Sequence, residues 1–244
     1  MSRALLVRRL GRLAYLPAMT LMEEVVRRRK AGEIPDSLLV LEHEPVITCP
    51  PRSPSELLLA DPETLRRRGI EIHPTSRGGL VTYHGPGQLV AYPILDLRPD
   101  RCDLHRYLRD LEEVVLRVLA RLGIQGTRRP GLTGVWVGTE KVAALGVRVS
   151  RWITSHGLAL NVGMDLAGFD SIIPCGLRAA GVTSCSRLAG RPVEVDEVAS
   201  LLVPILGQVF ERVPQEEDPL PTRQIGPLEA ARNPGPPKAA SEDP

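Results

Sequence analysis

RGGLVTYHGPGQLVAY, residues Arg77 to Tyr92, is the most informative segment of the sequence. Five of its sixteen residues are glycine or proline, yet residues typical of β-strands lie on both sides. Glycine lets backbone N–H groups approach a ligand closely, and proline stiffens a turn by fixing φ. Arg77 and His84 put a fixed cation and a titratable ring at the ends of the glycine segment. The pattern predicts a loop between two strands that holds an acyl or carboxyl group against backbone donors; a tight hairpin with incidental polar residues is the alternative.

The composition is that of a globular protein with an aliphatic core. The chain has 244 residues, of which 43% are hydrophobic and only 3% aromatic, enough for one large domain or two small ones. A net charge of +2 gives no electrostatic argument for a nucleic-acid partner. The apolar runs are far shorter than the roughly 20 residues of a membrane span, and the basic start of the chain lacks a secretory pattern. We therefore expect a cytoplasmic protein that binds neither nucleic acid nor membrane.

Residues 103–122 form the clearest predicted helix, because apolar side chains recur at the i, i+3, i+4, i+7 spacing of one helix face. Asp103 is the predicted N-cap and Gly123 the predicted stop. Further helices are predicted at 15–29, 62–68 and 196–213, and strands at 4–7, 37–42, 45–49, 70–73, 88–95 and 155–162, with a hairpin over 133–149 that turns at Thr139-Glu140.

This order of elements predicts an α/β or α+β fold, in which a mixed β-sheet is flanked by helices on one face. Residues 1–213 are expected to form a single domain. The last 31 residues, from Pro214, contain eight prolines and few large apolar side chains. Such a segment cannot bury enough surface to offset the entropy of ordering it, so we predict a disordered tail over 214–244.

Two residues in the second half of the chain are candidates for chemistry. Lys141 opens the apolar run KVAALGVRV, where a charged residue would either protect a sheet edge or point into a cleft. Cys175 lies in IIPCGL, between a proline and a glycine, so a constrained turn would present its thiol. A free cysteine is more often a small buried hydrophobe, and a nucleophilic one needs a nearby cation or base, such as Lys141 or His84.

The other cysteines and histidines form no recognisable site. Cys49, Cys102 and Cys185 make no CxxC pair, so neither a zinc ribbon nor a thioredoxin-type centre is indicated, and reduced thiols are expected. The histidines make no HExxH or similar pair, so we expect no metal.

Three segments together resemble the lipoyl(octanoyl) transferase family, the octanoyl-carrier-protein:protein octanoyltransferases. They are RGGLVTYHGPGQLVAYPI at 77–94, KVAALGVRVSRWITSHGLALNV at 141–162 and IIPCGL at 172–177. The resemblance covers roughly residues 1–210. It implies the fold of biotin and lipoate protein ligases, a mixed sheet flanked by helices in one domain.

The resemblance also implies an acyl transfer through a thioester on Cys175, with Lys141 as general acid and base. The donor would be octanoyl-phosphopantetheine on acyl carrier protein, with no ATP or other cofactor. The acceptors would be lysines on lipoyl domains of 2-oxoacid dehydrogenase complexes and on the glycine cleavage H protein, and we expect a monomer. The substrate-binding residues that the resemblance implies are Arg77, Gly78, Gly79, Leu80, Val81, Thr82, Tyr83, His84, Ala144, Leu145, Gly146, Gly157, Leu158 and Ala159.

The chain departs from the family where Cys49-Pro50-Pro51-Arg52 replaces the usual glycine-containing turn. Three other functions are open: a lipoate–protein ligase that uses ATP, an inactive relative that binds lipoyl domains, and a cysteine hydrolase with water as the acceptor. The combination of Cys175, Lys141 and His84 favours the transferase over the ligase and the binding module, and slow thioester hydrolysis is compatible with the sequence as a side reaction.

Overall fold

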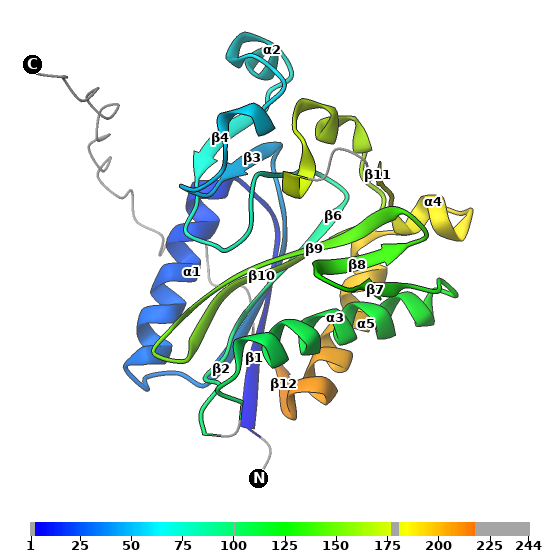
Figure 1. The fold of residues 1–244 in the computed structure, drawn as a ribbon. Helices are drawn as coiled ribbons and strands as arrows, with labels where there is room; N and C mark the ends of the chain where they lie inside the picture. Colours follow the sequence, from blue (N-terminus) through cyan, green and yellow to red (C-terminus); the bar gives the residue numbers. More distant parts are fainter. Residues whose placement is uncertain (1–2, 100, 177–180, 218–244) are drawn as a thin grey trace, which may run out of the picture.

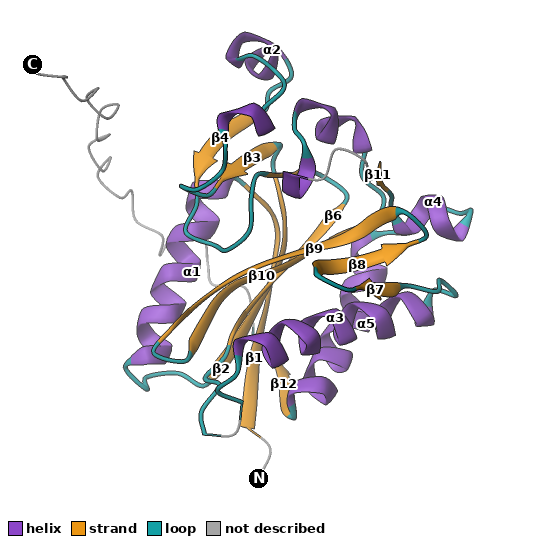
Figure 2. Cartoon of the chain, viewed as in Figure 1, coloured by secondary structure: helices purple, strands orange, loops and turns teal. Residues whose placement is uncertain are grey.

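The computed structural model describes residues 3–99, 101–176 and 181–217, except for the side chain of Cys175. Two sheets organise this part of the chain (Figures 1 and 2). The large sheet runs in the order β12 (Arg212–Glu216), β1 (Arg3–Leu13), β2 (Asp36–His43), β6 (Gln88–Ile94), β10 (Ile153–Asn161), β9 (Glu140–Ser150), β8 (Leu132–Val137) and β7 (Thr127–Arg129), and β11 (Gly181–Val182) also pairs with β9. The small sheet consists of β4 (Glu71–Pro74), β3 (Val46–Cys49) and β5 (Thr82–His84).

The large sheet is mixed, as predicted. Strand β1 runs parallel to both β2 and β12, whereas β2, β6, β10, β9 and β8 pair in antiparallel fashion. The elements predicted from the sequence are present with ends shifted by a few residues, apart from a first strand that is longer than predicted. The β8–β9 hairpin turns one residue earlier than predicted, at Gly138-Thr139.

Helices cover both faces of the large sheet, so the prediction of helices on one face is wrong. Helices α3 (Leu104–Arg121) and α5 (Val195–Phe210) pack on one face, and α1 (Tyr15–Lys30) packs on the other (Figure 1). Successive residues of β2 alternate between the two cores, with Leu38 in the first and Leu39 in the second. A strand buried on both faces is apolar throughout, and the run SLLVL was therefore a signal for two layers of helices.

The long helix α3 begins and ends as the sequence predicts. The Asp103 carboxylate accepts a hydrogen bond from the Arg106 backbone N–H at 3.0 Å, and Gly123 adopts a positive φ of 74° just after the helix. The remaining helices, α2 (Pro62–Arg67) and α4 (Cys185–Ala189), are short. No helix in the described part of the chain is long and apolar enough to cross a membrane.

The glycine-rich segment passes from one sheet to the other, which rules out the hairpin alternative. Strand β5 pairs with β3 in the small sheet, whereas β6 pairs with β2 and β10 in the large one. The turn at 85–87 joins them. Gly87 has a φ of 83°, and a Cβ there would lie 2.6 Å from the backbone nitrogen of Met164. Only glycine fits where the chain makes this turn.

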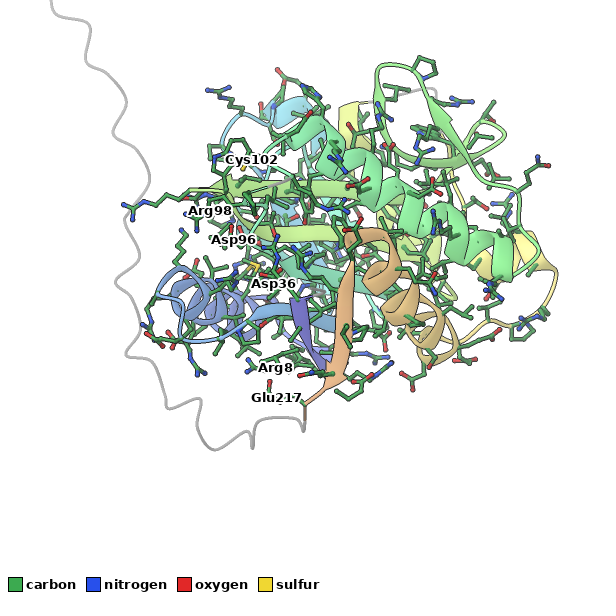
Figure 3. The ribbon with its side chains drawn as sticks, turned by 90° about the horizontal axis from the view of Figure 1, so that it is seen from below. Arg8, Asp36, Asp96, Arg98, Cys102 and Glu217 are labelled. Atoms are coloured by element: carbon green, nitrogen blue, oxygen red, sulfur yellow. The ribbon has the colours of Figure 1, made fainter. Side chains whose placement is uncertain are left out.

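The prediction of disorder from Pro214 onward is wrong for residues 214–217, which the structure describes. Pro214 lies within β12, which pairs in parallel with β1, and Glu217 follows the strand. Arg212 forms a buried ion pair with Asp36 at 2.7 Å. Arg8 pairs with Glu217 at 2.6 Å (Figure 3). These ion pairs, and the pairing of β12 with the edge of β1 that β2 does not cover, order residues 214–217. Their composition nevertheless resembles that of the residues after them. Residues 218–244 lie outside the described part of the chain.

We predict that Arg212→Ala lowers the free energy of unfolding by about 3 kcal/mol, because it removes one partner of the fully buried Asp36 carboxylate. Urea denaturation measures this difference. The matched control is Arg9→Ala, whose ion pair with Glu216, also on β12, is exposed and should contribute less than about 1 kcal/mol. Equal effects of the two substitutions would contradict the anchoring role of Arg212.

Candidate active site

A groove lies between the two sheets and encloses about 520 Å³ of empty space, including its open mouth. We call it the inter-sheet groove. It is lined from the large sheet by Val90, Tyr92, Ala144, Leu145, Gly146, His156, Gly157, Leu158 and Ala159, and from the small sheet, the preceding loop and α1 by Thr48, Thr82, His84, Arg77, Gly79, Leu80 and Tyr15. The lining is mostly apolar, which suits an aliphatic group.

Eleven of the fourteen substrate-binding residues implied by the sequence line this groove. The other three do not. Val81 and Tyr83 point into a small apolar core because side chains alternate along β5, and Gly78 instead donates its N–H to the Val147 carbonyl at 2.9 Å. Sequence reasoning missed Tyr15, Thr48, Val90, Tyr92 and His156. Of these, Val90 and Tyr92 belong to the glycine-rich segment, and strand alternation could have found them.

Arg77 holds the loop in place rather than pointing its whole guanidinium at a ligand. Its Nη1 donates to the carbonyls of Gly78 and Leu80 at 3.1 and 2.9 Å, and its Nη2 donates to the Thr48 carbonyl and hydroxyl at 3.2 and 2.8 Å. A Cβ at position 146 would lie 2.9 Å from Arg77 Cδ, so the glycine at that position makes room for this side chain. The sequence located Arg77 but not these acceptors.

Two buried histidines, His84 and His156, line the groove, and a third, His43, packs against His84; all three are neutral near pH 7. Burial lowers the pKa of His84 to about 3, with further contributions from His43 and Arg77. Burial also lowers the pKa values of His43 and His156 to about 4. Neutral rings let the groove accept an uncharged chain without leaving an unpaired ionic charge beside it.

The tautomer of His84 follows from a chain of hydrogen bonds. Asn161 Nδ2 donates to the Thr183 carbonyl at 2.9 Å, so Asn161 Oδ1 is free to accept from Gln88 Nε2, also at 2.9 Å. Gln88 Oε1 must then accept from His84 Nδ1, at 2.7 Å. The His84 Nδ1 therefore carries the proton, and its Nε2 presents a lone pair.

Lys141 is buried, and the alternative that it protects a sheet edge is wrong. Strand β9 pairs with β8, β10 and β11, so it has no free edge at this position. The Lys141 ammonium donates to the Thr133 carbonyl at 3.3 Å and lies 4.8 Å from the centre of the Trp136 ring. A cation is attracted to the face of an aromatic ring, which helps to hold the charge in a buried position.

Lys141 lines a second, smaller hollow together with Thr82, Gln88, Ala144, Asn161, Phe169, Pro174 and Val182. Thr82 and Ala144 also line the inter-sheet groove, so the two spaces adjoin. Pro174 opens the short 3₁₀ helix Pro174–Gly176, which contains the backbone of Cys175; the thiol itself lies outside the described structure. The fold thus brings the Pro-Cys-Gly turn and Lys141 to one hollow at the end of the groove.

The other cysteines are poor candidates for a nucleophile. Burial raises the pKa of the Cys185 thiol to about 12, and burial also raises the pKa of Cys49. Cys102 is exposed just before the start of α3, and it lines neither the groove nor the hollow of Lys141. Within the described residues, no group of three or more His, Cys, Asp or Glu side chains could hold a metal ion.

Comparison with known proteins shows the family of this chain. The family model described as "Lipoyl protein ligase A/B catalytic domain" matches residues 14–206. The chain belongs to this family. Curated relatives include an octanoyltransferase from Rubrobacter xylanophilus, 52% identical over 82% of this chain and 91% of the relative, and one from Solibacter usitatus, 48% identical over 84% and 92%.

Solved structures of lipoate and biotin protein ligases share the fold. A bipartite lipoate protein ligase from Thermoplasma acidophilum superposes with a TM-score of 0.70 at 19% identity, covering 89% of this chain and 87% of that one. Lipoate-protein ligase A bound with ATP gives 0.69 at 17% identity, covering 89% of each chain, and a biotin protein ligase from Aquifex aeolicus gives 0.53 at 13%, covering 84% and 70%. The predicted biotin/lipoate protein ligase-like fold is confirmed.

We predict that stability falls steeply as the pH drops from about 6.5 toward 4. The three buried histidines in and beside the groove have lowered pKa values, near 3 for His84 and near 4 for His43 and His156, whereas an unfolded histidine titrates near pH 6.5. The unfolded state therefore binds more protons in this window, and each histidine costs up to roughly 1.4 kcal/mol per pH unit.

Urea denaturation between pH 7 and 5 measures this loss. His43→Gln should reduce the slope of stability against pH by about one third, because one of three histidines no longer titrates. A stability that stays constant from pH 7 to 5 would contradict the neutral state of these rings.

Proposed function

We propose that the protein transfers an octanoyl group from octanoyl-acyl carrier protein to the ε-amine of a lysine on lipoyl domains. The observation that carries this proposal is the adjoining pair of spaces: an apolar groove for the chain, and at its end a hollow shared by Lys141 and the Pro-Cys-Gly turn. The curated relatives named octanoyltransferases, at 44–52% identity, support the same activity.

The proposed reaction has two steps through Cys175. The Cys175 thiolate attacks the thioester carbonyl, an acyl–S bond forms, and the pantetheine sulfur leaves and takes a proton from the Lys141 ammonium. The lysine ε-amine of the lipoyl domain then attacks the acyl-cysteine, the amide forms, and Lys141 accepts the proton that the amine loses. Cys175 is released from the acyl group as the thiolate with which the reaction began. A covalent intermediate of this kind divides one difficult transfer into two easier ones.

This reaction needs no ATP, because the acyl group arrives already activated as a thioester. The fold is shared with ATP-using ligases, so the fold does not decide between the two activities. We propose the lipoyl domains of 2-oxoacid dehydrogenase complexes and the glycine cleavage H protein as acceptors. The cytoplasmic location, the monomeric state and the absence of a metal remain predictions from the sequence.

The test is acylation of a lipoyl domain, followed by intact mass, under two conditions. With octanoyl-acyl carrier protein and no ATP, we expect the lipoyl domain to gain one octanoyl group per acceptor lysine. With free octanoate and ATP, we expect no gain. Acylation only in the second condition would make the protein a ligase. Acylation in neither condition would favour the alternative of an inactive relative that binds lipoyl domains.

Lys141→Ala should slow alkylation of Cys175 near neutral pH and move its pH dependence to higher pH, because a nearby cation favours the thiolate over the thiol. Peptide mass spectrometry after a short pulse of iodoacetamide measures the alkylated fraction of each cysteine. The exposed Cys102 is the control in the same molecule, and its alkylation should not change. An unaltered profile for Cys175 would contradict the pairing with Lys141.

A further inference from the structure

His156 has an unusual backbone for a residue in the middle of a strand. It lies within β10 and has a φ of 57°, in the left-handed region that favours glycine. A side chain with a Cβ is strained in this conformation, and such strain persists only where the surroundings fix it. The residue that follows is Gly157, in the same SHGLALN run.

The surroundings of His156 hold its ring on several sides. Its backbone N–H donates to Met22 Sδ at 3.3 Å, and its ring Nε2 lies 3.4 Å from the Ser76 hydroxyl. The ring meets Tyr92 edge-on, with the two centroids 5.9 Å apart and the planes at 82°. The residue is only 4% exposed. The backbone of His156 is thus bonded to α1, and its ring packs against the loop before β5 and against β6.

Two separate spaces lie close to this ring. His156, Gly157 and Tyr92 line the inter-sheet groove. Residues next to His156, namely Ser155, Ser76 and Met22, line a second groove with about 780 Å³ of empty space, including open solvent. Val26 and Ile153 add apolar surface to this second groove, and its charged lining residues are Glu23, Arg27, Lys30 and Arg148. His156 thus lies between the inter-sheet groove and the residues that line the second groove.

The strand register places His156 at the end of the inter-sheet groove far from Lys141. Along β9, Lys141 lines the hollow that adjoins the groove, Ala144 and Gly146 line the groove itself, and Val147 follows. The partner of Val147 on β10 is His156, whereas Gly146 faces Gly157. A chain attached near Lys141 and extended along these strands would therefore reach His156 last.

We propose that His156 is the end wall of the acyl site and sets the upper limit of acyl-chain length. This inference rests on the proposed function, because it takes the acyl carbonyl to lie where the hollow and the groove adjoin, at Ala144, about 10 Å along the strand from the register position of His156. The terminal methyl of an octanoyl group would contact the neutral imidazole. A longer chain would have to displace the ring to enter the second groove, where Met22, Val26 and Ile153 offer apolar contacts.

The test compares octanoyl- and dodecanoyl-acyl carrier protein as donors, using kcat/KM for acylation of a lipoyl domain. The variant is His156→Gly, which removes the wall and suits the positive φ, so it should fold. We expect the preference of the unmodified protein for the octanoyl donor to fall by on the order of tenfold or more, mainly through faster reaction of the dodecanoyl donor.

The matched control is Arg151→Gly. Arg151 also has a positive φ, 53°, but it lies exposed in the turn between β9 and β10 and touches neither groove. This control should keep the octanoyl preference of the unmodified protein, since it changes only the backbone strain.

Three outcomes are decisive. A folded His156→Gly variant that keeps the full octanoyl preference would overturn the inference, and so would one that loses activity with both donors, because His156 would then be needed for more than the wall. A relaxed preference in that variant alone would support it. Failure of the unmodified protein to acylate a lipoyl domain from either donor would instead count against the proposed function.

Discussion

The hydrogen bonds of the Arg77 guanidinium are the interaction on which the site depends. They bind the loop carbonyls of Gly78 and Leu80 to Thr48 in the small sheet. From the same loop, the Gly78 N–H donates to Val147 in the large sheet. The loop is thus fastened to both sheets, and the groove between them keeps its shape. A lysine at position 77 could not reproduce this, because it lacks the planar fork of donors.

The groove and the adjoining hollow differ in the chemical groups that line them. Around the groove, burial keeps the three histidines neutral, and the charged Arg77 guanidinium donates to the loop carbonyls and Thr48, so the lining that a hydrocarbon chain meets is mostly apolar. In the hollow, the Lys141 ammonium stays close to the Trp136 ring and a backbone carbonyl. The relay from Thr183 through Asn161 and Gln88 to His84 joins the two spaces with buried polar groups whose orientations are mutually fixed. Such a network is costly unless all its members are paired, and here each amide has its partner.

The sequence predicts this fold well where the information is local. Helix α3 could be located from its periodicity, its cap at Asp103 and its stop at Gly123, because all three depend on neighbouring residues. Strand β12 could not be located in this way, because its order depends on the ion pair with Asp36 and on the edge of β1 that β2 does not cover. Both are far away in the sequence. The family resemblance located most groove residues, but it could not show that Arg77 binds backbone carbonyls. The burial of Lys141 could not be predicted from the sequence either, since it requires that β9 pairs at this position with β8 on one side and β11 on the other.

The central claim is that Cys175 carries the acyl group, and a peptide map tests it most directly. The protein is mixed with octanoyl-acyl carrier protein without ATP, digested and analysed by mass spectrometry. We expect one octanoyl group on the Cys175 peptide, none on the peptides of Cys49, Cys102 or Cys185, no adduct in Cys175→Ser, and loss of the adduct when a lipoyl domain is added. Efficient acylation of the lipoyl domain by Cys175→Ser, or an adduct on another cysteine that is passed on in its place, would contradict the account.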